Sequence, residues 1–537
     1  MKIPNLSSLT EDHYGHEAYS NENYFRFHSE ALSCLSKRDQ WMFQYFGQGN
    51  REKPPFSCLH TAFEEQARIR PTQVAATHEG QSISYGELND KAVQLALYLR
   101  SEGVVEGDAV GLFLSRSIPM LIAILAVLKL GASYVPQHAG VAPKRVLKHV
   151  CDIAAIRIVL TLSKHSQDLP HFERQKVIYL DRALNKPKDD VSYDFPDVKP
   201  SSRCFILFTS GTTGSPNGVQ VTHNNVTNIV LTSPGSLQVQ AGMRVGQILS
   251  ISFDMCAWEI FVALCHGAEL VIRSSSIEQA VSSVDIVIAT PSILASLDLD
   301  KCKSVRVAAV AGEPCPQQLA DSWAEFCVFY NSCGPTETTI INTAQQYSGS
   351  GEKLTIGKPT PNNTVYILDD SLKPCPIGEV GEMWAGGECV TDGYIGNELL
   401  NAERYKPDPF LGNGYRMFRT RDLGKWTENG ELLHLGRTDD QVKIRGFRVE
   451  LDSISRIIER TENCYQAVTL KIDEKTLVSF VIPSDVNTED ARELVAKCLP
   501  YYCVPETIIK LDKFPKTERG KIDKSALLKH LKAVELG

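Results

Sequence analysis

The chain has 537 residues, more than one compact hydrophobic core accommodates, so its length predicts two or more domains. It is 43% hydrophobic and 22% charged, as is ordinary for a globular protein, and its formal net charge of −8 argues against a nucleic-acid partner. The first residues lack the apolar segment of a signal peptide, and the longest apolar run, 120–128, is too short to span a bilayer. The 15 cysteines form no CxxC pair, which indicates free thiols in a reducing compartment rather than a zinc site. We therefore expect a cytoplasmic protein with no membrane partner.

The predicted elements divide the chain into three parts. Residues 1–55 are polar and weakly patterned apart from an amphipathic stretch at 31–46, and we interpret them as a linker from an upstream domain. From residue 57, helical spacing and short apolar strands such as IRIVLTL, CFILFTS and VDIVIAT alternate, which predicts α/β layers with mostly parallel sheets. After about residue 379 the glycines become frequent and the strands shorten, which indicates a small β-rich part. The last hundred residues mix strands and helices as a separate small α+β domain would.

One loop has the composition of a phosphate-binding loop. The stretch FTSGTTGSPNGVQVTH (208–223) follows an apolar strand and combines hydroxyl side chains with three glycines, which let backbone N–H groups approach anionic oxygens. It is not a Walker loop, because Asn217 stands where a lysine would be expected. By composition alone, the stretch is equally consistent with a phosphate-binding loop and with a simple turn.

Two further stretches contain isolated charges. In NSCGPTETT (331–339), Glu337 is a lone acid suited to holding Mg²⁺ beside a phosphate, although a solvated glutamate in a helix cap fits as well. In GRTDDQVKIRGFRVEL (436–451), Arg437 could reach a ribose or a phosphate, or simply belong to an exposed strand.

Together these stretches resemble the superfamily of acyl-adenylate-forming enzymes, which includes adenylation domains of nonribosomal peptide synthetases, acyl-CoA ligases and firefly luciferase. The resemblance extends from about Ser57 to Leu531 and also includes SYGELN, LKLGASYVP, SFDMCAWEIF, GEVGEMWAGGECVTDGY, RTRDL, LPYYCVP and ERGKIDK. FDMCAWE followed by GPTETT is similar to the amino-acid-activating branch. The stretch SCLHTAFEEQ resembles the linker that follows a condensation domain, so the chain resembles one domain of a larger, fungal synthetase.

The resemblance implies a fold and a reaction. It implies a large core domain (56–438) and a small, mobile C-terminal domain (439–537). In this family, a substrate carboxylate attacks the α-phosphate of ATP, pyrophosphate leaves, and the acyl group then passes to the phosphopantetheine thiol of a carrier domain. The implied cofactors are ATP and Mg²⁺. The implied partners are an amino acid and the carrier and condensation domains of the same synthetase, with the isolated domain a monomer.

The same resemblance implies roles for individual residues. Those expected to bind ATP are Thr209, Ser210, Gly211, Thr212, Thr213, Gly214, Cys333, Gly334, Asp422 and Arg437. Thr336 would contact the α-phosphate, Glu337 would hold Mg²⁺, and Lys521 would bridge the substrate carboxylate and the phosphate. Asp439 would be the hinge about which the small domain rotates.

The substrate pocket is implied in the same way. Asp254, which lies between apolar residues, would pair with the substrate α-ammonium, although a buried helix cap is its simpler interpretation. The other implied pocket positions are Met255, Trp258, Ile288, Ala309, Ala311, Ser332, Ile340 and Ile341. Because they include no second acid, we expect a large neutral side chain, such as N-acyl-N-hydroxyornithine in siderophore assembly. The alternatives are an aromatic amino acid, a CoA ligase, and a domain that no longer adenylates.

Four positions depart from the family pattern. Asn217 replaces a lysine, Cys333 an aromatic residue that stacks on adenine, Arg421 a glycine, and His434 an aromatic residue. A lost stacking ring costs roughly 1 kcal/mol, so we expect ATP binding to persist and leave reduced turnover open.

Overall fold

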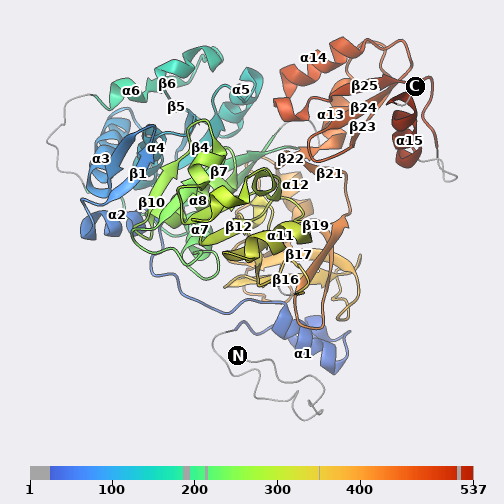
Figure 1. Cartoon of the computed structure of the whole chain (residues 1–537), viewed down its shortest axis with the longest axis horizontal. Helices are drawn as coiled ribbons and strands as arrows, with labels where there is room; N and C mark the ends of the chain where they lie inside the picture. The colour runs from blue at the N-terminus through green and yellow to red at the C-terminus, as the bar shows by residue number, and fades with distance from the viewer. Residues whose placement is uncertain (1–23, 186–193, 212–215, 350, 517–521, 536–537) are drawn as a thin grey trace.

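The computed structural model describes residues 24–185, 194–211, 216–349, 351–516 and 522–535. Figure 1 shows a large body with a smaller group of C-terminal elements at one corner, joined to it through the segment between β19 and β21. The predicted α/β organisation, with a β-rich part and a small α+β domain, is confirmed.

Two sheets form most of the large domain. The six-stranded sheet, as far as the structure describes it, has the order β6 (Lys176–Tyr179), β5 (Ile158–Thr161), β3 (Ala109–Leu114), β4 (Ser133–His138), β7 (Arg203–Thr209) and β8 (Asn217–Thr222). The larger sheet has the order β15 (Lys358–Pro359), β14 (Thr343–Tyr347), β13 (Val328–Cys333), β12 (Val307–Val310), β11 (Ile286–Ala289), β9 (Arg244–Gln247), β10 (Glu269–Ile272), β1 (Val74–His78) and β2 (Gln81–Ser84). Their central strands are parallel, so the carboxyl ends of several strands meet at one edge of each sheet, where ligands of such folds bind.

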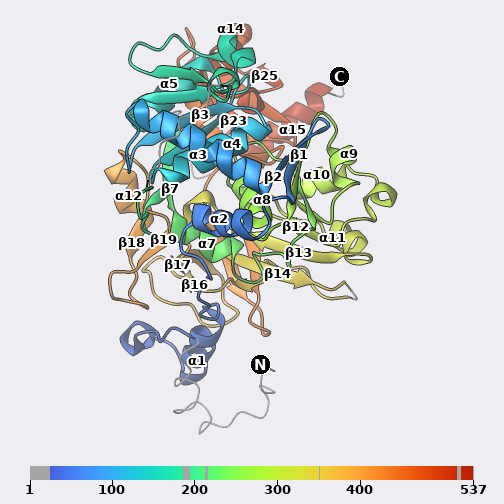
Figure 2. The same cartoon turned by 90° about the vertical axis from the view of Figure 1, so that its left-hand side faces the viewer.

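Helices cover and separate these sheets (Figures 1 and 2). They are α2 (Leu59–Ile69), α3 (Tyr85–Ser101), α4 (Ile118–Lys129), α5 (Lys144–Ile153), α6 (Leu180–Ala183), α7 (His223–Val230), α8 (Asp254–Leu264), α9 (Ile277–Val281), α10 (Pro291–Ala295) and α11 (Gln317–Ala324). The apolar run of the sequence lies in α4, which is buried on all sides and contacts strands of both sheets. Its last residue, Lys129, is buried but forms an ion pair with Glu64 of α2, which offsets the cost of burying the ammonium group.

The β-rich part is a third sheet of β16 (Asn363–Leu368), β17 (Gly381–Gly387), β18 (Tyr405–Pro407), β19 (Arg416–Trp426) and β20 (Leu432–Arg437), with α12 (Glu398–Arg404) beside it. The amino-terminal helix α1 (Lys37–Phe46) packs against this sheet (Figures 1 and 2). Phe43 of α1 stacks on Tyr366 of β16, and Trp41 and Phe46 are buried with them. The described part of the segment interpreted as a linker is therefore packed on the large domain. The amphipathic stretch 31–46 was the signal for this contact.

The small domain begins with the hairpin β21 (Gln441–Ile444) and β22 (Phe447–Glu450). It continues with α13 (Leu451–Ile458), β23 (Gln466–Lys471), β24 (Leu477–Ile482), α14 (Thr488–Cys498), β25 (Thr507–Lys510) and α15 (Lys524–Glu535). Within the described ranges, no helix is both long enough and apolar enough to cross a bilayer.

Candidate active site

A cavity of about 1180 Å³ lies between the large domain and the hairpin of the small domain. Its wall is formed by the carboxyl ends of β4, β7 and β13, by the loops after β9, β10 and β12, and by residues of the hairpin and of 499–503. The predicted ATP-binding residues that the structure describes all line this cavity, namely Thr209, Ser210, Gly211, Cys333, Gly334, Asp422 and Arg437. Thr212, Thr213, Gly214 and the predicted catalytic Lys521 lie outside the described residues.

The start of the phosphate-binding loop is attached to the small domain. The Ser210 hydroxyl donates a hydrogen bond to the carbonyl oxygen of Arg448 on β22, at 2.9 Å. At the other end of the loop, the amide oxygen of Asn217 accepts a hydrogen bond from Asn397 at 3.1 Å. Asn217 therefore occupies the predicted lysine position with a neutral side chain that is already bound to a neighbour.

Glu337, the predicted Mg²⁺ ligand, is fully buried and bound to a guanidinium group. Arg448 Nη1 lies 2.9 Å from each carboxylate oxygen, and the Tyr394 hydroxyl donates to Oε1 at 2.6 Å. Burial alone would raise the pKa of Glu337, but the charge of Arg448 outweighs it and lowers the pKa to about 2. The carboxylate is thus suited to holding a cation. A metal ion would bind there only after Arg448 had moved away.

Asp254 is partly buried and forms no ion pair with a described residue. Asp254 is the first residue of α8. Its carboxylate accepts hydrogen bonds from the Met255 backbone N–H and from the Thr336 hydroxyl, both at 2.7 Å. Burial raises its pKa, and the nearby Lys443 ammonium reduces that shift. No lysine or arginine of the described chain lies within ion-pair distance, and the carboxylate borders the cavity. Thr336, predicted to contact the α-phosphate, is bonded to Asp254 in this arrangement.

The hairpin β21–β22 brings two cations into this region that the sequence reasoning did not single out. Lys443 and Arg448 face each other across the hairpin and lie near Asp254 and Glu337, respectively. Gly446, in the turn, has φ +81°, and a Cβ there would lie 2.9 Å from Thr290 Cγ2, so this close approach requires glycine. The basic residues of QVKIRGFRVEL were the only signal in the sequence for these two cations. Which acids they contact depends on how the two domains pack together.

The Phe447 ring fixes the hairpin from the other side. Its centroid lies 4.6 Å from that of Phe253, directly before Asp254, and 3.8 Å from that of Tyr502 in the small domain. Aromatic packing thus joins both domains at the cavity.

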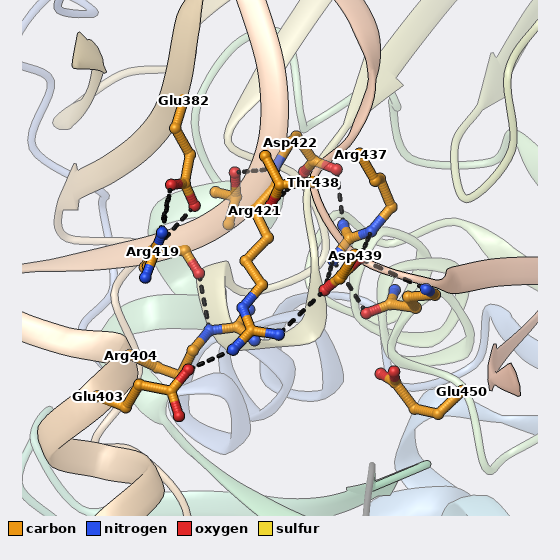
Figure 3. Close-up of polar contacts among 12 residues, drawn as sticks. Glu382, Glu403, Arg404, Arg419, Arg421, Asp422, Arg437, Thr438, Asp439 and Glu450 are labelled. Carbon is orange, nitrogen blue, oxygen red and sulfur yellow. Dashed lines mark hydrogen bonds and ion pairs between the residues drawn. The ribbon is translucent and has the colours of Figure 1, made fainter. Parts of the chain in front are cut away.

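Asp422 and Asp439 share Arg437 (Figure 3). Arg437 Nη1 donates to Asp422 at 2.6 Å and its Nε donates to Asp439 at 2.7 Å. Burial would raise the pKa of Asp422, but a hydrogen bond from His434 and the charge of Arg437 lower it. The predicted ribose-binding acid and the predicted hinge are therefore held charged in one network, and His434 belongs to it.

Arg421, which departs from the family glycine, adopts a left-handed backbone conformation with φ +63°. Its guanidinium group forms an ion pair with Glu403 and lies 3.5 Å from Asp439 (Figure 3), and Arg421 is not among the residues that line the cavity. Arg421 therefore does not replace the missing loop lysine in this arrangement but is attached to the hinge.

Four of the predicted pocket positions line the cavity with Asp254, namely Met255, Ala311, Ser332 and Ile340. The other four, Trp258, Ile288, Ala309 and Ile341, are fully buried and do not reach the cavity surface. The Trp258 indole N–H donates to the carbonyl oxygen of Gly235 at 2.6 Å, which fixes the ring in the core. Burial raises the pKa of Cys333 to about 12, so its thiol is neutral.

Comparison with known proteins gives consistent matches. Residues 63–395 match the family model described as AMP-binding enzyme. Adenylate-forming reductase 06235 of Coprinopsis cinerea is 42% identical over 511 residues, covering 93% of this chain and 49% of that protein. Gramicidin S synthase 1 of Brevibacillus brevis is 33% identical over 93% of this chain and 47% of its own length. The chain thus spans about half the length of these relatives.

Among solved structures, a similar fold occurs in PA1221, described as a nonribosomal peptide synthetase protein containing adenylation and carrier (PCP) domains bound to a vinylsulfonamide inhibitor. The TM-score is 0.80 with 23% sequence identity, over 88% of this chain and 84% of that one. At this identity the match establishes the fold alone.

Proposed function

We propose that this chain, which belongs to the AMP-binding enzyme family as an ATP-dependent adenylate-forming ligase, is of the nonribosomal peptide synthetase type and takes an α-amino acid as its acyl substrate. The observation that carries this proposal is the carboxylate of Asp254. It is partly buried at the cavity, with two neutral donors and no ion-pair partner among the described residues. An unpaired buried carboxylate is costly, and a substrate ammonium group would provide the missing charge.

The proposed reaction uses the cavity residues mainly for positioning. A substrate carboxylate oxygen forms a bond to the α-phosphorus of ATP as the bond to the pyrophosphate oxygen breaks. Thr209, Ser210 and Gly211 would surround the phosphates, and Asp422 would accept hydrogen bonds from the ribose hydroxyls. Such reactions require little covalent chemistry from the protein, and preorganised dipoles and charges supply most of the rate enhancement.

A bound Mg²⁺ would neutralise phosphate charge as it developed. We infer that Glu337 holds this ion when the hairpin withdraws Arg448, because the buried carboxylate already accommodates a cation of the hairpin. Lys521 would then bridge the substrate carboxylate and the phosphate, as the family resemblance implies.

In the second step, the thiol of a carrier-bound phosphopantetheine would attack the acyl carbon and AMP would leave with its phosphate oxygen. The carrier belongs to the proposal, as do a condensation domain of the same protein and a monomeric isolated domain. Relatives named adenylate-forming reductases support a second fate for the thioester, in which a hydride donor reduces it to an aldehyde and frees the thiol. Product analysis of the whole protein, with and without a nicotinamide hydride donor, distinguishes reduction from peptide synthesis.

For the substrate side chain, we retain a large neutral group such as N-acyl-N-hydroxyornithine, which would place the chain in siderophore assembly. An aromatic amino acid is the alternative. The small Ala311 and Ser332 at the cavity wall support either choice.

The proposed function is tested by amino-acid-dependent ATP–pyrophosphate exchange, using the proteinogenic amino acids and acylated hydroxyornithines. We expect exchange with one amino acid and its loss in Lys521→Ala. A CoA ligase would instead form thioesters from a simple acid and retain activity in Asp254→Ala. A domain that no longer adenylates would bind ATP without exchange, and Asn217→Lys would then be the variant to restore it.

A further inference from the structure

A second group of basic side chains lines the cavity. Arg116 follows β3, His138 ends β4, and Arg273 follows β10, so the three side chains come from both main sheets. All three line the cavity together with Ser250 and Ser252. They lie beyond the carboxyl ends of parallel strands, where ligands of such folds bind.

The two guanidinium groups lack an acidic partner. The described ion pairs include neither Arg116 nor Arg273, and the Nε of each is buried without a hydrogen-bond partner among the described residues. Arg116 makes one long hydrogen bond, from Nη1 to the carbonyl oxygen of Leu249 at 3.3 Å. Burial lowers the pKa of Arg273, and the charge of Arg116 lowers it further, which shows that the two like charges are close.

A buried acid, Glu259, lies near the two guanidinium groups but forms no ion pair with either of them. Glu259 is buried on α8 and accepts backbone hydrogen bonds from Ile248 and Leu249. Burial raises its pKa to about 8, so it is largely protonated at neutral pH. Among the described residues, the two guanidinium groups therefore line the cavity without an ion-pair partner.

We propose that Arg116 and Arg273 form an anion-binding subsite of the cavity, separate from the ATP phosphate loop, for a carboxylate or phosphate group. The planar guanidinium is suited to paired hydrogen bonds with either anion. The subsite is close to the amino-acid pocket, because the backbone N–H of His138 donates to Ser252 Oγ at 2.9 Å, two residues before Asp254.

This inference rests on the proposed function, which supplies two ligands that can carry the anion. One is a second carboxylate on the side chain of the amino acid, which would replace the neutral side chain proposed above. The other is the phosphate of phosphopantetheine, whose thiol must reach the acyl-adenylate in the same cavity.

Calorimetric binding to the whole chain tests the subsite with matched pairs of probes. Glutamate and aspartate are compared with glutamine and asparagine, and 4′-phosphopantetheine is compared with pantetheine. We expect the anionic member of one pair to bind at least tenfold more tightly than its neutral partner. An amino-acid preference identifies the substrate as the source of the anion, and a phosphopantetheine preference identifies the thiol acceptor.

Arg273→Gln should abolish that preference, Arg273→Lys should retain part of it, and Arg456→Gln should leave it unchanged. Arg456 is an exposed arginine of α13 and controls for the loss of one positive charge. The proposal is overturned if the wild-type protein does not distinguish the members of any pair, or if Arg273→Gln retains the preference while unfolding at the wild-type temperature. The binding measurement does not require turnover. Absence of pyrophosphate exchange would therefore count against the proposed function, whereas the comparison of anionic with neutral probes would still test the subsite.

Discussion

Glu337 and Asp254 are both carboxylates near the cavity, but Glu337 is fully buried, Asp254 is partly buried, and their partners differ. Glu337 is bound by a guanidinium and a phenol, and its pKa is lowered to about 2, whereas Asp254 is bound by a hydroxyl and an amide, and its pKa is raised. The first group is a completed ion pair between domains, whereas the second forms no ion pair with a described residue, although Lys443 is near it. Burial alone therefore does not identify a ligand site. Whether a carboxylate already has a charged partner within the protein decides whether it is available to a cationic ligand.

The largest expected effect is on the Glu337 side of this comparison. Glu337→Gln removes the nearer anion of the buried Arg448 guanidinium, leaving Glu450 at 3.7 Å, and should lower the free energy of unfolding by up to about 3–5 kcal/mol. Urea unfolding followed by tryptophan fluorescence measures it. The double variant Glu337→Gln/Arg448→Met should recover part of the loss, and equal stabilities of single and double variants would show that the pair is not coupled.

Removal of Asp254 should affect activity more than stability. Asp254→Ala should lower kcat/KM for the amino acid roughly 10²- to 10³-fold, because the substrate ammonium loses its counter-ion. Pyrophosphate exchange measures it, with circular dichroism as the folding control. Activity within threefold of wild type would contradict the assigned role.

Acidification should weaken the Glu337 contact selectively. Its folded-state pKa of about 2 lies below the ordinary value of 4.5, so its contribution is present above pH 4.5 and is lost as the pH falls toward 2. The full contribution is about 3 kcal/mol. In urea unfolding, the difference in free energy of unfolding between wild type and Glu337→Gln should therefore decrease from pH 6 to pH 3. A difference that stays constant over this range would disprove the lowered pKa of Glu337.

Arg421→Gly should have a smaller effect, located at the hinge. It removes a side chain from a left-handed position and frees Asp439 from one of its two guanidinium partners. Backbone relief and ion-pair loss oppose each other, so we expect stability within about 1 kcal/mol of wild type. In single-turnover experiments, the ratio of the adenylation rate to the thiol-transfer rate should change by a few-fold. An unchanged ratio would exclude a role of Arg421 in domain movement.

The last expected effect is on turnover and is located at the phosphate loop. Asn217→Lys adds a cation near the proposed path of pyrophosphate and should raise kcat of exchange by up to roughly tenfold. Asn217→Gln, which adds length without charge, is the matched control. Equal rates in the two variants would show that the missing charge does not limit turnover.

Much of the fold follows from local sequence patterns, whereas the partners in the site do not. The apolar runs 204–210 and 284–290 predicted the strands β7 and β11, and the continuous apolar run at 120–128 lies in the buried helix α4, because burial is encoded in each segment itself. The ion pair of Glu337 joins residues 111 positions apart and requires the domains to meet as they do here. Likewise, Arg116 and Arg273 follow strands of different sheets, so no spacing in the sequence predicts that they lie near each other.

The central claim, that Asp254 selects an α-ammonium group, is tested most directly by a matched pair of substrates. The activated amino acid and the same acid without its amino group are compared in pyrophosphate exchange with wild type and with Asp254→Ala. We predict that wild type prefers the amino acid by at least roughly 100-fold in kcat/KM and that the variant loses this preference. Equal exchange of the two acids by the wild-type protein would contradict the account.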